Sequence, residues 1–137
     1  MHCHNFLLGH IEVEVQGRAY DLHNFYNAEA IRHDVLKGSL TLTFNRLQQD
    51  WVPVEEARQI ILSFSQLSYF CADAREMNAF ESDLGCVHAI GVVEAGAATE
   101  TFYLSDQFPA DHHLVIEFTS GLILRLRAQE AQCALFF

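Results

Sequence analysis

The chain has very little positive charge. Its 137 residues include eight Lys plus Arg against eighteen Asp plus Glu, for a formal net charge of -10, and Lys37 is the sole lysine. A surface that binds phosphates needs clustered cations whose counterions are released on contact. The composition therefore argues against nucleic acid as a direct partner, whereas an acidic surface favours encounter with cationic proteins.

Long apolar runs are also missing. No run approaches the roughly 20 residues that a bilayer-spanning helix needs, and the first ten residues lack a basic stretch followed by a long apolar core. We therefore expect a cytoplasmic protein with no membrane partner. No Cys-x-x-Cys pair occurs, and the four cysteines are far apart in sequence. They could form two bridges in three ways, but reduced thiols are the rule in the cytoplasm.

The familiar catalytic motifs are absent. There is no Gly-x-Ser-x-Gly elbow, no His-Glu-x-x-His helix and no Gly-rich phosphate loop. Four histidines on expected strands could approach Asp21, Asp34, a serine or a cysteine: His23, His33, His88 and His113. A catalytic triad is defined by geometry rather than by residue types, so we assign no catalytic residues and expect no cofactor. These absences favour a protein that is not an enzyme.

Hydrophobic residues are plentiful and alternate with polar ones. They make up 50% of the chain and include eleven Phe, enough for one folded domain spanning residues 1–137. The clearest pattern is the stretch 113–128, which alternates on both sides of Thr119-Ser120-Gly121. A three-residue loop there pairs Ile116 with Leu124 and Leu114 with Leu126, and it places Gly121 where a left-handed residue is needed.

Two more hairpins are predicted upstream. Alternation over residues 11–22 indicates two strands joined at Gly17-Arg18, with Val15 opposite Tyr20. A strand over residues 39–45 follows a four-residue loop at 35–38, which sets Ile31 opposite Leu42. Later strands are expected at 87–93, as an interior strand, and at 101–105, while residues 129–137 fit either a last strand or a short helix.

The segment 59–80 is ambiguous. Ile60, Leu62 and Phe64 alternate as in a strand, whereas Ile61, Phe64, Leu67 and Cys71 would share a helical face. Its serines and β-branched start favour a strand over 59–72, and we expect a short helix over 72–80. The whole pattern predicts an all-β fold of seven to nine short strands, an antiparallel sandwich or open barrel. If 59–80 is largely helical, the alternative is α+β.

Histidines near the N-terminus and around residue 112 raise the possibility of metal binding. Imidazoles, with a thiolate or carboxylate beside them, can hold zinc or copper. The candidate ligands are His2, His4, His10, His112 and His113, with Cys3 between the first two. The spacing matches no known metal motif, so this stays an alternative: a small metal-dependent enzyme or metal-binding protein.

Acidic loops and aromatic residues beside prolines predict a protein-binding surface. Aromatic anchors ringed by acids are what a protein would use to clamp a cationic partner. The residues expected to contact such a partner are Trp51, Glu76, Glu81, Asp83, Asp106, Phe108 and Asp111.

The strand rhythm resembles that of small bacterial immunity-type β proteins encoded beside polymorphic toxins. The resemblance rests on Ile31 with 40–44, then 60–64, then 116–128, about a third of the chain. It implies a noncatalytic protein that binds and blocks a toxin, and an acidic surface would suit a basic nuclease. It carries over no site residues. Self-association through an edge strand or the Ala-Leu-Phe-Phe tail is a further expectation.

Overall fold

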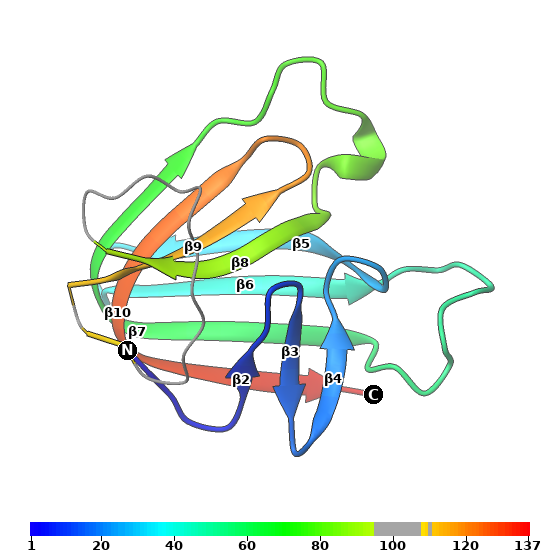
Figure 1. Cartoon of the computed structure of the whole chain (residues 1–137), viewed down its shortest axis with the longest axis horizontal. Helices are drawn as coiled ribbons and strands as arrows, with labels where there is room; N and C mark the ends of the chain where they lie inside the picture. Colours follow the sequence, from blue (N-terminus) through cyan, green and yellow to red (C-terminus); the bar gives the residue numbers. More distant parts are fainter. Residues whose placement is uncertain (95–107, 110) are drawn as a thin grey trace.

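The chain folds as an all-β protein, as the alternating pattern predicts. The computed structural model describes residues 1–94, 108–109 and 111–137. In that part of the chain the only helical element is a 3-10 turn, η1 (Glu81–Asp83), and no helix is long and apolar enough to cross a membrane. A six-stranded antiparallel sheet curls into a half-barrel, and a separate three-stranded sheet packs beside it (Figure 1).

The main sheet has the strand order β5-β6-β7-β10-β9-β8, and β1 pairs with β10 outside this path. Its strands are β1 (His2–Cys3), β5 (Tyr26–Asp34), β6 (Ser39–Arg46), β7 (Gln59–Asp73), β8 (Val87–Val93), β9 (His113–Phe118) and β10 (Ile123–Phe136).

Two long strands form the centre of this sheet. β7 pairs with β10 over nearly the full length of both, while the other side of β10 carries β9 at its start and β1 further along. Asn5 extends the short parallel pairing of β1. Its side-chain amide donates to the Cys133 carbonyl at 2.6 Å, and its Oδ1 accepts the Cys133 N–H at 2.9 Å. A side chain thus satisfies backbone groups that the two-residue strand leaves unpaired.

The small sheet consists of β2 (Leu7–Leu8), β3 (Glu12–Val15) and β4 (Arg18–Asp21). The predicted turn at Gly17-Arg18 is wrong by one residue. Val13, not Val15, lies opposite Tyr20, because the turn residues are Gln16 and Gly17, with φ of 53° and 80°. Two consecutive positive φ values match a type I′ turn, whose twist suits a hairpin.

The other two hairpins have the predicted registers. Ile116 faces Leu124 and Leu114 faces Leu126, and Gly121 has a φ of 87°. In the β5–β6 hairpin, Ile31 faces Leu42. In these two cases loop length and core face agree on a single register.

The helix expected over 72–80 is not formed. β7 runs to Asp73, and residues 74–80 contain only a turn. Gln66 has a φ of 52°, and the β7–β10 register shifts between Arg127 and Ala128. Such a β-bulge moves the inward positions by one residue. It leaves Ser68 without a partner on β10, so Leu67 and Phe70, opposite the buried Ala128 and Leu126, are three residues apart. This spacing looks helical in the sequence although both residues lie on one strand.

The tail belongs to the sheet, because β10 continues unbroken from the last hairpin to Phe136. β8 is apolar on both faces, as expected of an interior strand, yet it ends the strand order. Its outer edge is covered: Ile90 donates its N–H to the His10 carbonyl at 2.7 Å, just before β3. The strand expected at 101–105 lies outside the described residues.

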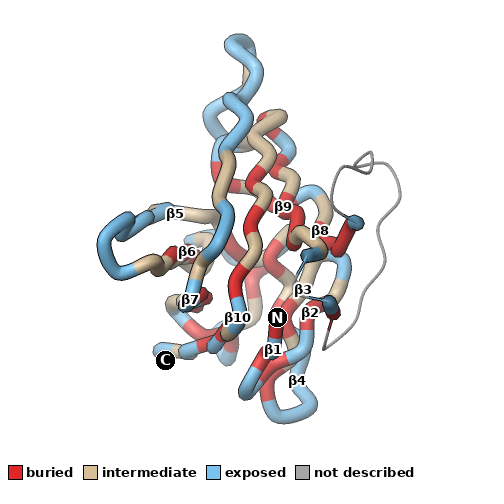
Figure 2. Tube along the Cα trace, turned by 90° about the vertical axis from the view of Figure 1, so that its left-hand side faces the viewer, coloured by how far each residue is buried: buried red, intermediate tan, exposed pale blue. Residues whose placement is uncertain are grey.

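One hydrophobic core joins the two sheets. It includes Phe6, Val13 and Tyr20 from the N-terminal segment and small sheet, and Phe44, Phe64, Ile116 and Leu124 from the main sheet. Figure 2 shows many buried positions along β9 and β10, whereas the connections and the outer parts of β5 and β7 are largely exposed. Truncating a buried Phe to Ala costs about 3–5 kcal/mol, so the half-barrel and small sheet stabilise one another.

Candidate protein-binding surface

The connection between β7 and β8, residues 74–86, exposes large apolar side chains. Met77 is 96% exposed and Phe80 76%, and Leu84 is also exposed. The connection projects away from both sheets at the top of Figure 1. Apolar groups clustered on a short projecting segment are a common mark of an interaction site. We call residues 74–86 the projecting connection.

Carboxylates surround these apolar side chains. Glu76 and Glu81 are exposed, Asp83 is half-buried, and none of the three has an ion-pair partner among the described residues. Arg75 directs its guanidinium to the backbone carbonyl of Glu76, at 3.2 Å, rather than to a carboxylate. The negative charges are therefore available to a cationic partner.

Backbone hydrogen bonds hold the projecting connection in place. Glu76 donates its N–H to the Ser120 carbonyl at 2.8 Å, which fixes the start of the connection against the β9–β10 turn. Within it, Asp83 donates to Phe80 at 2.9 Å and Leu84 to Glu81 at 3.3 Å. These bonds fix the backbone while the side chains stay in solvent, so a partner would meet a partly organised loop.

Gly85 fixes the other end. Its carbonyl accepts the Ala28 N–H at 2.8 Å, which joins the connection to the first half of β5. A Cβ built on Gly85 would lie 2.4 Å from the Ala28 carbonyl oxygen and 2.8 Å from its nitrogen. Only glycine allows the two backbones to approach so closely.

The residues predicted to bind a partner do not form one surface. Glu76, Glu81 and Asp83 lie on the projecting connection at the top of Figure 1, whereas Trp51 lies in the β6–β7 loop, which extends to the right of the sheets. Trp51 is 59% exposed and its ring lies 6.2 Å from that of Phe25.

Of the remaining predicted binding residues, the structure describes Phe108 and Asp111. Phe108 is only 8% exposed and is part of the core, so its side chain is not available as an anchor. Its carbonyl accepts the N-terminal ammonium at 2.9 Å. Asp111 is exposed, and its hydrogen bond with the His112 ring, 3.1 Å long, lowers the pKa of Asp111. Asp106 lies outside the described residues.

The sequence did not single out Met77, Phe80 and Leu84. An apolar residue is usually taken as core, and the short helix expected over 72–80 would have turned some of these side chains inward. The one available signal was that Met77, Phe80 and Leu84 stand among Glu76, Glu81 and Asp83.

The histidines proposed as metal ligands lie in separate places. The rings of His2 and His4 are 4.5 Å apart, and His4 Nε2 contacts the Glu130 carboxylate. His113 instead stacks on Tyr69 at 4.7 Å; burial and then the charge of Arg127 lower its pKa. His10 is exposed before β3. Within the described ranges, no three His, Cys, Asp or Glu side chains come together as a metal site would require.

A cysteine and a histidine do approach each other beside β8. Cys86 Sγ lies 3.5 Å from His23 Nδ1, but the same nitrogen lies 2.6 Å from the Val87 carbonyl. A carbonyl accepts only, so Nδ1 carries a proton and donates it. That nitrogen is therefore unable to take a proton from the thiol, and the pair lacks the geometry of an activated nucleophile.

A buried ionic network lies beneath the β6–β7 loop. Glu56, only 6% exposed, accepts hydrogen bonds from the Tyr26 hydroxyl at 2.8 Å and from the Arg18 guanidinium at 3.0 Å. Burial first, and then the bond to Glu56, raise the pKa of Tyr26. Arg46 also binds the carbonyls of Val54 and Glu56 at 2.9 and 3.0 Å. Because all these groups are paired, we assign the network to stability.

Comparison with known proteins finds no match to any family model, curated protein or solved structure.

Proposed function

We propose that this chain is a noncatalytic binding domain that uses the projecting connection to hold a cationic protein. The observation that carries the proposal is the exposure of Met77 and Phe80 on a loop whose backbone is fixed at both ends. Exposed apolar side chains of this size cost solubility, so a role in contact with a partner explains their position.

The charge distribution supports the same proposal. The carboxylates of Glu76, Glu81 and Asp83 would meet basic groups on the partner, while Met77 and Phe80 would enter an apolar pocket. Complementary charge speeds encounter and selects the partner, and the apolar anchors supply most of the affinity. A basic toxin, blocked by this chain in the manner of an immunity protein, is the partner class that we favour.

The proposal is tested by photo-crosslinking in the native host. A benzophenone amino acid replaces Phe80 in one variant and Val54 in another; Val54 is 87% exposed in the β6–β7 loop and serves as the matched control. We expect an adduct with a basic protein from position 80 and none from position 54. Equal labelling from both positions, or none from position 80, would contradict the proposal.

Surface plasmon resonance then separates the two contributions, because it measures the association and dissociation rates. The partner that the crosslink identifies is purified without the crosslink. Its binding is measured to wild type, to Phe80→Ser and to the double variant Glu81→Gln, Asp83→Asn. Loss of Phe80 should weaken binding by about tenfold or more, mainly through faster dissociation. The charge variant should bind more slowly and lose its dependence on salt. If both variants bind the partner with wild-type rates and affinity, the interface lies elsewhere on the chain.

A further inference from the structure

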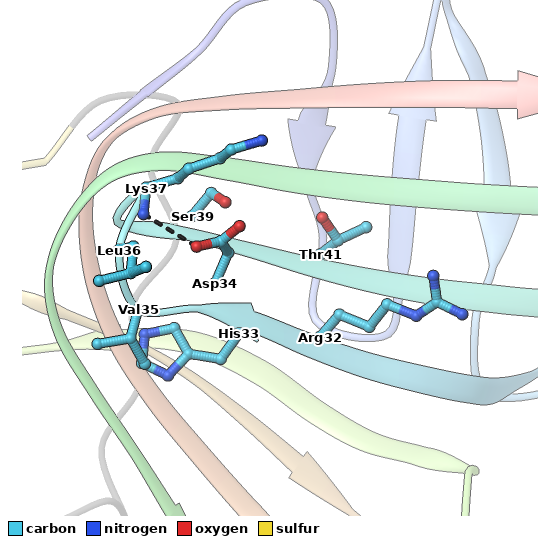
Figure 3. Close-up of a pocket in the computed structure, with 8 residues that line it drawn as sticks. All are labelled: Arg32, His33, Asp34, Val35, Leu36, Lys37, Ser39 and Thr41. Atoms are coloured by element: carbon cyan, nitrogen blue, oxygen red, sulfur yellow. Dashed lines mark hydrogen bonds between the residues drawn. The ribbon is translucent and has the colours of Figure 1, made fainter.

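Within the part of the chain that the structure describes, the outer half of β5 is an uncovered sheet edge. Ile31, Arg32, His33 and Asp34 are all exposed, as are Val35 and Leu36 at the hairpin tip. Among the described residues, the last backbone bond to this edge is the one from Ala28 to Gly85. A shallow hollow of about 530 Å³ lies along the tip, and Figure 3 shows the side chains that line it.

The backbone direction of β5 follows from β6. Arg46 donates its N–H toward β7, to the Arg58 carbonyl at 2.9 Å. Because backbone direction alternates along a strand, Leu42 and Leu40 also face β7. Their partners on β5 are Ile31 and His33, whose own N–H and C=O groups must therefore point away from β6. The free edge offers donors and acceptors at alternate residues, as pairing with another strand requires.

The charges on this edge fit a second copy of the same strand. In an antiparallel pair centred on His33, Arg32 of each copy lies opposite Asp34 of the other, and Ile31 lies beside Val35, the first residue of the turn that follows β5. Sliding the pair by two residues in one direction sets Arg32 against Arg32, and in the other direction Asp34 against Asp34. Only the register centred on His33 pairs opposite charges and apolar residues at once.

Neither charged side chain has an ion-pair partner within the described part of one copy. Arg32 and Asp34 are two residues apart and project from the same face of β5. Asp34 Oδ1 accepts the Lys37 N–H at 2.9 Å (Figure 3), which leaves Oδ2 for an arginine across the axis.

We propose that two copies of this chain associate through β5, antiparallel about a two-fold axis at His33, so that two half-barrels share one continuous sheet. The interface is short, so it belongs to the weak, concentration-dependent class. It uses a different surface from the projecting connection and does not depend on the proposed function.

Sedimentation equilibrium of the full chain, from micromolar to millimolar concentration, tests this association. Wild type should show a monomer–dimer equilibrium. Arg32→Asp and Asp34→Arg should each raise the dimer dissociation constant by about tenfold or more, because each sets like charges across both symmetric pairs. An equimolar mixture of the two variants should recover association, because their charges are complementary. The double variant R32D/D34R should recover it alone.

Ile31→Pro gives an independent test. The Ile31 N–H points outward, so proline there removes no bond to β6 and is tolerated at an edge, yet it blocks strand addition. This variant should be monomeric with an unchanged melting temperature. Phe80→Ser is the control that should dimerise like wild type. A wild type that stays monomeric throughout, an Ile31→Pro variant that still dimerises, or variants that fail to associate when mixed would overturn the proposal.

Discussion

Two connections join β7 to the strands before and after it, and they differ in which groups hold them in place. The β6–β7 loop turns back on the core: Val52, Glu56 and Ala57 are buried, and side-chain bonds from Arg18, Tyr26 and Arg46 hold it. The projecting connection is held by its backbone and keeps Met77 and Phe80 in water.

The difference separates stability from recognition. Side chains that hold a loop against the core are buried and cannot contact a partner. Where backbone hydrogen bonds hold the loop instead, its side chains remain exposed and can bind another molecule. Substitutions at the buried positions of the β6–β7 loop should therefore change the free energy of unfolding. Substitutions in the projecting connection should change binding alone, except at the position where its backbone meets β5.

That exception gives the largest expected effect. Gly85→Ala should lower the free energy of unfolding by about 3 kcal/mol, because the new Cβ would meet the Ala28 backbone and break the bond that joins the connection to β5. Urea denaturation measures it. Gly17→Ala is the control: nothing lies within 4 Å of its Cβ position, so only the strain of a positive φ, about 1 kcal/mol, should remain. Equal losses for the two would argue against the tight crossing at Gly85.

Removing the anchor of the β6–β7 loop comes next. Glu56→Ala should cost about 2 kcal/mol, because it leaves the buried Tyr26 hydroxyl without its acceptor. Glu55→Ala, one residue away and exposed, should stay within about 0.5 kcal/mol of wild type. If both variants unfold at the same urea concentration, the network does not hold the loop.

Tyr26 of this network and the buried Cys133 predict that the free energy of unfolding falls at alkaline pH. Tyr26 has a pKa raised above its ordinary value of 10.0, and burial raises the pKa of Cys133 from 9.0 to about 12. Both groups keep their protons in the folded state, so their contribution is fully present below the ordinary pKa values. It is lost as pH rises, from about 9 for Cys133 and from about 10 for Tyr26, by at most about 1.4 kcal/mol per pH unit for each group.

Tyr26→Phe tests the assignment. At neutral pH it should cost about 1 kcal/mol through the lost hydrogen bond, and above pH 10 its stability should fall less steeply than that of wild type. Urea titrations across the alkaline range measure both effects. Tyr69→Phe, at an exposed strand position, is the matched control for removal of a phenol hydroxyl. A Tyr26→Phe profile parallel to wild type would contradict the raised pKa.

The smallest effect on stability is expected at the exposed apolar residues. Phe80→Ala should change the free energy of unfolding by less than about 0.5 kcal/mol, whereas Val52→Ala in the buried loop should cost about 1–2 kcal/mol. Thermal melts of the two variants compare them directly. A large loss for Phe80→Ala would mean that its ring supports the fold and would weaken the case for a binding role.

The strands could be predicted because local pattern and turn chemistry agree there. Thr119-Ser120-Gly121 has one loop length that buries Leu114, Leu124 and Leu126 together, and the structure has that register. The predicted register of the Gly17 hairpin was wrong because Gln16 adopts a positive φ, which is uncommon for glutamine and could not be expected from the sequence. The helical alternative for 59–80 arose because a bulge at Ser68 gives a strand the three-residue spacing of a helical face. The short helix over 72–80 was wrong: β7 runs to Asp73, and Met77 and Phe80 stay in solvent.

For the candidate binding site, the sequence could predict only the acidic residues that lie close together along the chain. Glu76, Glu81 and Asp83 are close in sequence and share one connection. Trp51 and Phe108 also looked like loop aromatics, but the packing of Phe108 depends on contacts distant in sequence. Glu56 gave no signal, because its partner Tyr26 is 30 residues away and only the folded sheet brings them together.

β10 follows every other strand in the sequence, yet it lies between β7 and β9. As the chain emerges from the ribosome, β5, β6 and β7 can pair with one another. The edge of β7 that later pairs with β10 has no partner until β10 is synthesised. The full sheet requires pairing between distant segments, which slows folding, and this unpaired edge is exposed to aggregation in the meantime. We therefore expect folding to be most sensitive to chaperones between the synthesis of β7 and that of β10.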